Sequence, residues 1–222
     1  MNYIKYIARQ GANLCPGDCS IDIDIEMLQT VEKEVNDRFE YLASRVTILR
    51  RTGINTDPYH VMKHSIYLYL LSRALFENDI LDEYRIKDRL YCLNKALHGL
   101  DIFYRVKLPT VFLLTYSTQI VLGACVYGEN LVVYQGVTCG STLDNIPVLG
   151  SNIVLMPNCV ISGSSRIGNN VVVSAGVVIA NKQVPDNVIV FGNGGDSRDL
   201  IYHPLKDNRY IDYFIQPSLE LR

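Results

Sequence analysis

The chain has 222 residues, enough for one large domain or for two smaller ones that each bury a core. Its 21 basic and 23 acidic residues give a net charge of -2 and are spread along the sequence, which argues against a nucleic-acid partner. No apolar run is long enough to span a membrane, and the apolar stretch at the start is too short for a secretory signal. The sequence therefore predicts a cytoplasmic protein with no membrane span.

The first hundred residues predict an irregular arm followed by a helical domain. Residues 1–20 show no sustained period and are interrupted by glycine and proline, so we expect no regular element there. Over 21–51, apolar residues recur every three or four positions with charges between them, as an amphipathic helix requires. Two more helices are expected over 59–77 and 81–97, which gives a helical domain over 21–100. The apolar positions of the first helix are Ile25, Leu28, Val31, Val35, Phe39 and Leu42.

Beyond Asp101 the helical period stops and a six-residue repeat begins. Aliphatic residues occupy every sixth position, and the residue after each of them is usually small. A strict six-residue period places one inward side chain on each flat face of a three-sided coil. The alternative fold, a β-sandwich, would instead show apolar residues alternating every two positions. The repeat therefore predicts a left-handed parallel β-helix. The repeating positions are Leu149, Leu155, Ile161, Ile167, Val173 and Ile179.

The same register continues upstream of the clear repeats. Counting back in sixes from Cys139 gives Val133, Tyr127 and Val121. The step from Cys139 to Leu149 equals one hexad plus a four-residue insertion, so we expect a loop that interrupts the coil without ending it. Asparagine and glycine suit the corners between faces, because they tolerate left-handed backbone angles.

The predicted fold class is α+β: an N-terminal α-helical domain followed by a left-handed parallel β-helix of hexapeptide repeats over 101–195. Roughly four coils fit between 101 and 185. The C-terminal tail, 196–222, is expected to be ordered only if it packs on a neighbour. Because a solenoid exposes open edges and flat faces that packing between copies usually covers, we expect a homotrimer or a dimer of trimers.

Four short segments carry a recognisable pattern. They are Asn94 to Ile102, Val121 to Gly123, Tyr134 to Thr138 and Val190 to Asn193. In order and spacing these segments resemble serine acetyltransferases and their relatives in bacterial surface-polysaccharide pathways. The resemblance runs from about 57 to 195, and the family also places a helical domain before its β-helix.

The resemblance implies an acetyl-CoA-dependent O-acetyltransferase whose acceptor is an amino acid or a sugar hydroxyl. In the family, acetyl-CoA lies in the groove between neighbouring β-helices, and the acceptor hydroxyl attacks the thioester. Because a hydroxyl is a poor nucleophile at neutral pH, the family uses a histidine general base, a carboxylate that orients it, and backbone amides that hold the oxyanion. Asp101 falls on the carboxylate position.

The family's base position holds a tyrosine in this chain. Leu114-Thr115-Tyr116 stands where the family has Leu-Asp-His, and the loop 141–147, which carries a second histidine in the family, has none here. A phenol, with an ordinary pKa near ~10, is a poor base at pH 7. Three roles are open for Tyr116: an aromatic plug, a hydrogen-bond donor to the acceptor or oxyanion, or, if its phenol ionises, the base itself.

Other histidines are candidate substitutes. His98, at the mouth of the first coil, could act as the base, or it could cap the preceding helix, where a cation favours the C-terminal dipole. His60 and His64 share a helical face and could bind zinc, but no third ligand is evident, so a solvated or core pair is the alternative. Cys15 and Cys19 enclose only a turn. We expect no metal.

The resemblance also assigns ligand-binding positions. Asp57 precedes Pro58 in a segment resembling the family's Asp-Pro, whose carboxylate contacts the acceptor; a turn or capping role is the alternative. Contacts with acetyl-CoA come mostly from the backbone of small residues. By position these are Gly140, Ser141, Pro157 and Ala175, of which Ser141 and Pro157 depart from the family's Gly and Ala.

Two further functions stay open. The missing histidines are compatible with a weak or silent homologue that binds CoA or serves as an assembly partner. The second is N-acetylation of an amino sugar. It is also compatible with the missing histidines, because an amine acceptor needs a weaker base than a hydroxyl does.

Overall fold

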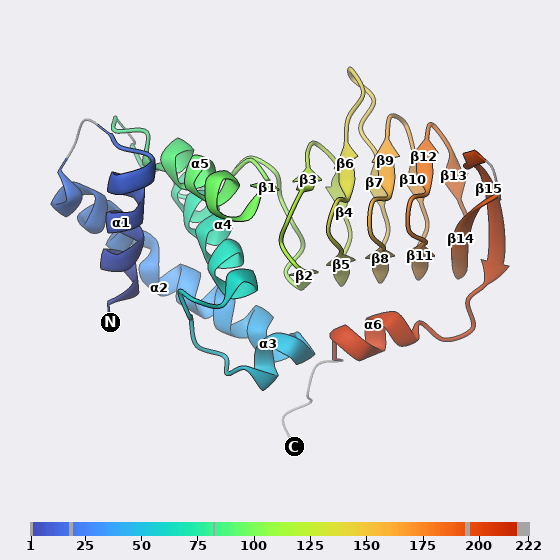
Figure 1. Cartoon of the computed structure of the whole chain (residues 1–222), viewed down its shortest axis with the longest axis horizontal. Coiled ribbons are helices and arrows are strands. Elements are labelled where there is room, and N and C mark those ends of the chain that lie inside the picture. The colour runs from blue at the N-terminus through green and yellow to red at the C-terminus, as the bar shows by residue number, and fades with distance from the viewer. Residues whose placement is uncertain (1, 18–19, 82, 194–195, 217–222) are drawn as a thin grey trace.

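The computed structural model describes residues 2–17, 20–81, 83–193 and 196–216. Figure 1 shows a group of helices at one end and a stack of coils at the other. Helices α1 to α5 come first, and the strands that follow form a β-solenoid of about five turns. The expected order of a helical part before a solenoid is confirmed. No helix among the described residues is both long and apolar enough to span a membrane.

The helical part forms where the sequence places apolar residues on one side of each helix. Its helices are α1 (Tyr3–Leu14), α2 (Ile21–Arg45), α3 (Thr47–Arg51), α4 (Val61–Glu77) and α5 (Ile86–His98). Along α2, five of the six predicted apolar positions are buried, with Ile25 packed at the edge of the core. The Ser20 hydroxyl caps this helix by accepting a hydrogen bond from the Ile23 backbone N–H. Gly99, with φ of 61°, ends α5 in the left-handed conformation.

The expectation of an irregular arm over 1–20 is wrong for most of that segment, because α1 occupies Tyr3–Leu14. Ile4, Ile7 and Gly11 recur on one helical face and are buried. A glycine inside a helix costs only about 1 kcal/mol, which burial of two isoleucines outweighs. Cys19, one of the two cysteines around the predicted turn, lies outside the described residues.

The solenoid consists of three sheets that the chain visits in turn. Sheet 1 contains β1 (Leu100–Asp101), β3 (Ile120–Leu122), β6 (Thr138–Gly140), β9 (Val160–Ser162) and β12 (Val178–Ala180). Sheet 2 contains β4 (Val126–Tyr127), β7 (Val148–Leu149), β10 (Arg166–Ile167) and β13 (Gln183–Val184). Sheet 3 contains β2 (Phe112–Leu114), β5 (Leu131–Val133), β8 (Ile153–Leu155), β11 (Val171–Val173), β14 (Val188–Asn193) and β15 (Asp196–Pro204). All neighbouring strands pair in parallel except β14 with β15.

The six-residue repeat is confirmed from Leu149 to Ile179, because every predicted inward residue there is at most 4% exposed. Upstream, the prediction for Val121 is wrong: its side chain is 38% exposed, and Leu122 points inward instead, in register with Cys139. The step from Leu122 to Tyr127 is only five residues, so the period is shorter there. The first turn, built on β1 and β2, also lacks the hexad signature. The solenoid has about five turns, one more than the roughly four coils that the sequence indicated.

The corner from sheet 2 to sheet 3 shows how asparagine shapes the coil. Asn130, Asn152, Asn170 and Asn187 stand one above another with φ between 57° and 61°. Their side chains form a ladder, in which Asn130 donates to Asn152 at 2.8 Å and Asn170 donates to Asn187 at 2.7 Å. The predicted role of corner asparagines is thereby confirmed.

The C-terminal segment packs on its own chain, contrary to the expectation that it needs a neighbour. Strand β15 pairs antiparallel with β14 at the end of the solenoid. The chain then returns beside the coils, and α6 (Arg209–Phe214) contacts α3 and β8 (Figure 1). Arg45 and Gln216 fix this return, since the Gln216 N–H donates to the Arg45 carbonyl at 2.9 Å and Arg45 Nε donates back to the Gln216 carbonyl at 2.9 Å.

Candidate active site

The corner from sheet 3 to sheet 1 brings several predicted site residues into one column. The turns after β2, β5, β8 and β11 carry Tyr116, Tyr134, Pro157 and Ala175. Tyr116 adopts φ of 59° and is 68% exposed, so its ring stands out from the coil. Gly140 and the adjacent Ser141 lie elsewhere, at the far end of β6.

A pocket of about 510 Å³ opens beside Tyr116. We call it the aromatic pocket. It is lined by Ile48, Tyr59, His60, Val61, Met62, Thr115, Tyr116, Tyr134 and Phe214. The ring centroids of Tyr116 and Tyr134 are 6.4 Å apart, and those of Tyr134 and Phe214 are 6.0 Å apart in an edge-on arrangement. Five separate parts of the chain meet here, which no local pattern could have indicated.

The segment before α4 is held by a buried ammonium. Lys63 is 1% exposed, and its Nζ donates to the backbone carbonyls of Thr52, Gly53 and Asn55 at 3.0, 2.6 and 3.2 Å. Asp57 follows, and its Oδ1 accepts a hydrogen bond from the Tyr59 N–H at 2.9 Å. This is the geometry of a turn. A contact between Asp57 and an acceptor stays a prediction.

His60 is the imidazole that lines the aromatic pocket. It stands at the N-terminus of α4, and its Nδ1 is buried with no hydrogen-bond partner. Burial, followed by the charge of Lys63, lowers the pKa of His60, while Asp57 acts weakly in the opposite direction. His60 is therefore uncharged at pH 7, the state in which an imidazole can accept a proton. The sequence indicated His60 only together with His64, as a zinc pair or as a solvated or core pair.

Asp101 is engaged with α5. Its Oδ1 accepts from the Tyr91 hydroxyl at 2.5 Å and its Oδ2 from Lys95 Nζ at 2.7 Å. Partial burial alone would raise the pKa of Asp101, but the hydrogen bonds from Lys95 and Tyr91 outweigh burial and hold the pKa below its usual range. Both carboxylate oxygens thus have donors, and neither donor is Tyr116 or a histidine. The predicted orienting role stays a prediction.

His98, which is half-buried, forms a pair with the buried His64. Nδ1 of His64 lies 2.9 Å from Nε2 of His98, so one ring donates to the other. Burial lowers the pKa of both to about 4, with the neighbouring His98 adding to the effect on His64. The pair is uncharged at pH 7, so the alternative of a cationic cap on α5 does not apply. His64 also faces the rings of Tyr3 and Tyr6.

Acid is expected to destabilise the protein through the His64–His98 pair. In the unfolded chain each ring binds a proton below about pH 6.5, whereas the folded rings resist protonation down to about pH 4. This stabilisation is complete above pH 6.5 and is lost as the pH falls through 4. We expect the pair to lower the free energy of unfolding by on the order of 3 kcal/mol between pH 7 and pH 4. Urea titrations at several pH values measure the free energy of unfolding of the wild type and of a His64→Leu/His98→Leu variant. An equal dependence of this free energy on pH in the two proteins would contradict the prediction.

Within the described ranges, no three His, Cys, Asp or Glu side chains gather as a metal site would require. His60 and His64 do not converge on a common ligand, because His64 is paired with His98. The five described cysteines are free thiols.

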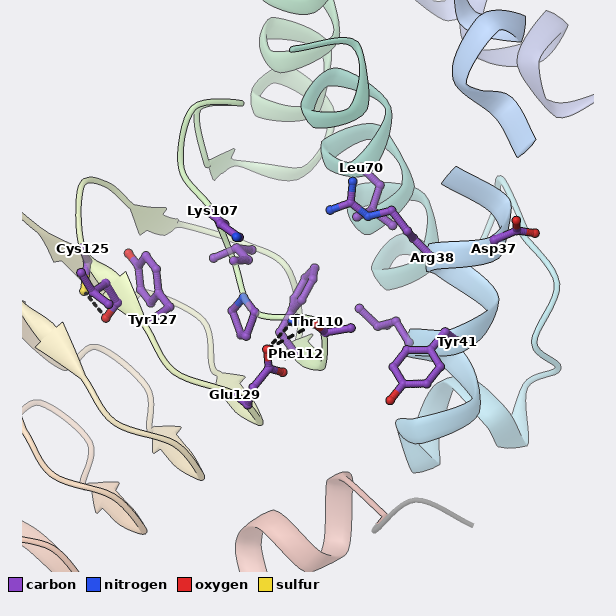
Figure 2. A pocket seen from close by; sticks show the side chains of 14 residues that line it. Asp37, Arg38, Tyr41, Leu70, Lys107, Thr110, Phe112, Cys125, Tyr127 and Glu129 are labelled. Carbon is purple, nitrogen blue, oxygen red and sulfur yellow. Dashed lines mark hydrogen bonds between the residues drawn. The ribbon is translucent and has the colours of Figure 1, made fainter. Parts of the chain in front are cut away.

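A second cavity, of about 790 Å³, lies between the helices and the first coils (Figure 2). Most of its ionic side chains already form ion pairs or hydrogen bonds within the protein. Arg38 pairs with Glu34 and Glu77 at 3.3 and 2.7 Å, and Glu129 accepts from the Thr110 N–H and hydroxyl at 3.1 and 3.2 Å. No histidine lines this cavity, so it offers no comparable base.

The candidate backbone contacts for acetyl-CoA differ in how well they suit a ligand. A Cβ on Gly140 would meet nothing closer than 3.6 Å, and one on Gly176, next to Ala175, would meet nothing within 4 Å, so both positions are open. Pro157 has no N–H to donate, and its carbonyl already accepts from the Gly176 N–H at 2.9 Å. Pro157 therefore cannot act as a hydrogen-bond donor, and the contacts of Gly140, Ser141 and Ala175 with acetyl-CoA stay a prediction.

Comparison with known proteins agrees with this architecture. The family model described as bacterial transferase hexapeptide (six repeats) matches residues 146–181. A serine acetyltransferase of Staphylococcus epidermidis is 26% identical over 137 residues, which are 60% of this chain and 62% of the relative. The chain thus spans about 62% of the length of the curated relatives it matches.

Solved serine acetyltransferases share the fold. That of Neisseria gonorrhoeae superposes with a TM-score of 0.68 at 20% identity, over 94% of this chain and 80% of that one. The Brucella abortus enzyme in complex with coenzyme A gives a TM-score of 0.64 at 20% identity, over 91% and 82% of the two chains.

The solenoid and the matching repeats show a hexapeptide-repeat protein. The chain is serine acetyltransferase-like, a distant homologue of those enzymes.

Proposed function

We propose that this protein is an acetyl-CoA-dependent O-acetyltransferase whose acceptor is a hydroxyl of an amino acid or a sugar. The observation that carries the proposal is that one pocket holds the uncharged imidazole of His60 beside Tyr116, the residue that the resemblance assigns to the family's base position. The homology to serine acetyltransferases and the coenzyme A complex of a structural neighbour support acetyl-CoA as the donor.

In the proposed reaction, the acceptor oxygen attacks the thioester carbonyl while its proton passes to the His60 imidazole. The new C–O bond forms, the C–S bond breaks, and coenzyme A leaves as a thiol after taking up the proton. The Tyr116 hydroxyl serves as a hydrogen-bond donor to the acceptor or the oxyanion. Gly140 and Ala175 face the pantetheine arm. A homotrimer would supply a neighbouring β-helix as the other side of the acetyl-CoA groove.

Release of the coenzyme A thiol tests the proposal. We expect the wild type to release thiol from acetyl-CoA only when a hydroxyl acceptor is present. A Tyr116→His variant, which restores an imidazole at the family's base position, should retain or exceed that rate. Acceptor-independent release, or none in either protein, would overturn the proposal.

A second candidate is a silent homologue that binds CoA. It is favoured by the two hydrogen bonds that Asp101 accepts, because their donors, Tyr91 and Lys95, are not the base that the family's carboxylate orients. This candidate predicts no turnover in the wild type and a gain of turnover in Tyr116→His, so the same assay separates the two functions.

A further inference from the structure

None of the nine described residues that line the aromatic pocket carries an ionised side chain at pH 7. Eight of them are alcohols, phenols, hydrocarbons or a thioether, and His60 is neutral because burial lowers its pKa. Neither Asp57, two residues before Tyr59, nor Asp212, two residues before Phe214, is part of the described lining. Asp57 Oδ1 accepts a hydrogen bond from the Tyr59 N–H. A carboxylate that entered would lose water without meeting a counter-charge among the described lining residues.

The pocket presents aromatic surface that only a ligand or a partner would cover. Tyr59 is 79% exposed and Tyr116 is 68% exposed, and the rings of Tyr134 and Phe214 continue the same wall. Burial of such rings is strongly favourable, and aromatic faces pack best against other ring-shaped apolar faces. The volume of about 510 Å³ is that of a small-molecule site.

The C-terminal helix supplies one side of this pocket. Phe214 is the last residue of α6, which is anchored on both sides. Before the helix, Asn208 Nδ2 donates to the Asn152 carbonyl at 3.2 Å; after it, Ile215 forms a bridge with Val46. The wall therefore depends on the segment that returns along the solenoid.

From these observations we propose that the aromatic pocket binds an uncharged acceptor that carries its hydroxyl on a ring, and that Phe214 and Tyr59 determine this specificity. The inference rests on the proposed function and narrows its acceptor class. A free amino acid such as serine is disfavoured, because its carboxylate would be desolvated without a counter-charge. A neutral sugar and an aromatic alcohol share the required chemistry.

Binding measured without acetyl-CoA tests the acceptor class separately from turnover. Methyl β-D-glucopyranoside, benzyl alcohol and L-serine are compared as probes by saturation-transfer NMR and calorimetry on the full chain. We expect at least one ring probe to bind and L-serine not to. Tyr59→Ala and Phe214→Ala should each weaken ring binding about tenfold. Tyr59 is so exposed that its removal should leave the fold intact.

Tyr210→Ala is the matched control, since Tyr210 lies on α6 but not in the pocket lining. It should leave ring binding unchanged. A preference for the glucoside identifies a sugar acceptor, and a preference for benzyl alcohol identifies an aromatic one. Tighter binding of L-serine, no binding of either ring, or equal affinities in all variants would overturn the inference. So would a change of oligomeric state in Phe214→Ala without a change in binding, because a second copy would then be the occupant.

The two proposals fail in different ways. Ring binding without thiol release would contradict acetyl transfer and leave the acceptor class standing. Thiol release with L-serine, but with neither ring probe, would support acetyl transfer and contradict the proposed acceptor class.

Discussion

Replacement of His60 by asparagine is expected to lower the rate of acetyl transfer by about 10²- to 10⁴-fold, the range typical of a lost general base. Asparagine is a preferred N-cap residue, so the start of α4 should survive the change. Because the amide cannot take up the acceptor proton, kcat should fall while the KM for acetyl-CoA changes little. Steady-state thiol release over pH 6 to 9 is the measurement.

His203→Asn provides the matched control for His60→Asn. His203 is exposed on β15 and does not line the aromatic pocket. Its variant should keep the wild-type rate. A His60→Asn protein that retains activity within about threefold would show that another group accepts the proton, and the mechanism would have to be reassigned.

Gly150→Ala is expected to destabilise the solenoid by about 3 kcal/mol or more, because the new methyl group would overlap backbone atoms of the neighbouring coil. A Cβ on Gly150 would lie 2.7 Å from the Gly168 carbonyl oxygen and 2.8 Å from its carbon, both backbone atoms of the next coil. Parallel strands stack about 4.8 Å apart, so neither coil can yield without breaking its hydrogen bonds. Gly128 and Gly168 occupy the same column and face the same restriction.

Gly140→Ala is the control for this steric argument. It lies in β6 of the same solenoid, yet its Cβ would approach nothing closer than 3.6 Å, which is ordinary contact. Thermal unfolding followed by circular dichroism should show a large loss of stability for Gly150→Ala and little change for Gly140→Ala. Comparable losses in the two variants would contradict the tight stacking at the Gly150 corner.

The solenoid was predictable because its core residues follow a short repeating pattern in the sequence. One aliphatic residue per face recurs at a fixed interval, and Asn170 marks a corner that needs a left-handed backbone. The prediction went wrong at Val121, where a five-residue step moves the inward position to Leu122. It also missed α1, because Gly11 was taken as an interruption although it lies on the buried face of that helix.

The candidate site was predictable only in part. Tyr116 could be found by its place in a motif, whereas Phe214 joins the pocket through a chain reversal that no spacing encodes. His60 was visible in the sequence, but its partner there was taken to be His64. The structure separates them, since His64 turns to His98 and His60 lines the pocket. Contacts between distant segments decide such roles.

The most direct test of the account is whether the wild-type protein moves an acetyl group from acetyl-CoA onto a hydroxyl, detected as an ester product by mass spectrometry alongside free coenzyme A. The account predicts that both products accumulate in equal amounts when a neutral ring-bearing acceptor is supplied. Intact acetyl-CoA after prolonged incubation with such acceptors, at a protein concentration sufficient for single turnover, would contradict it.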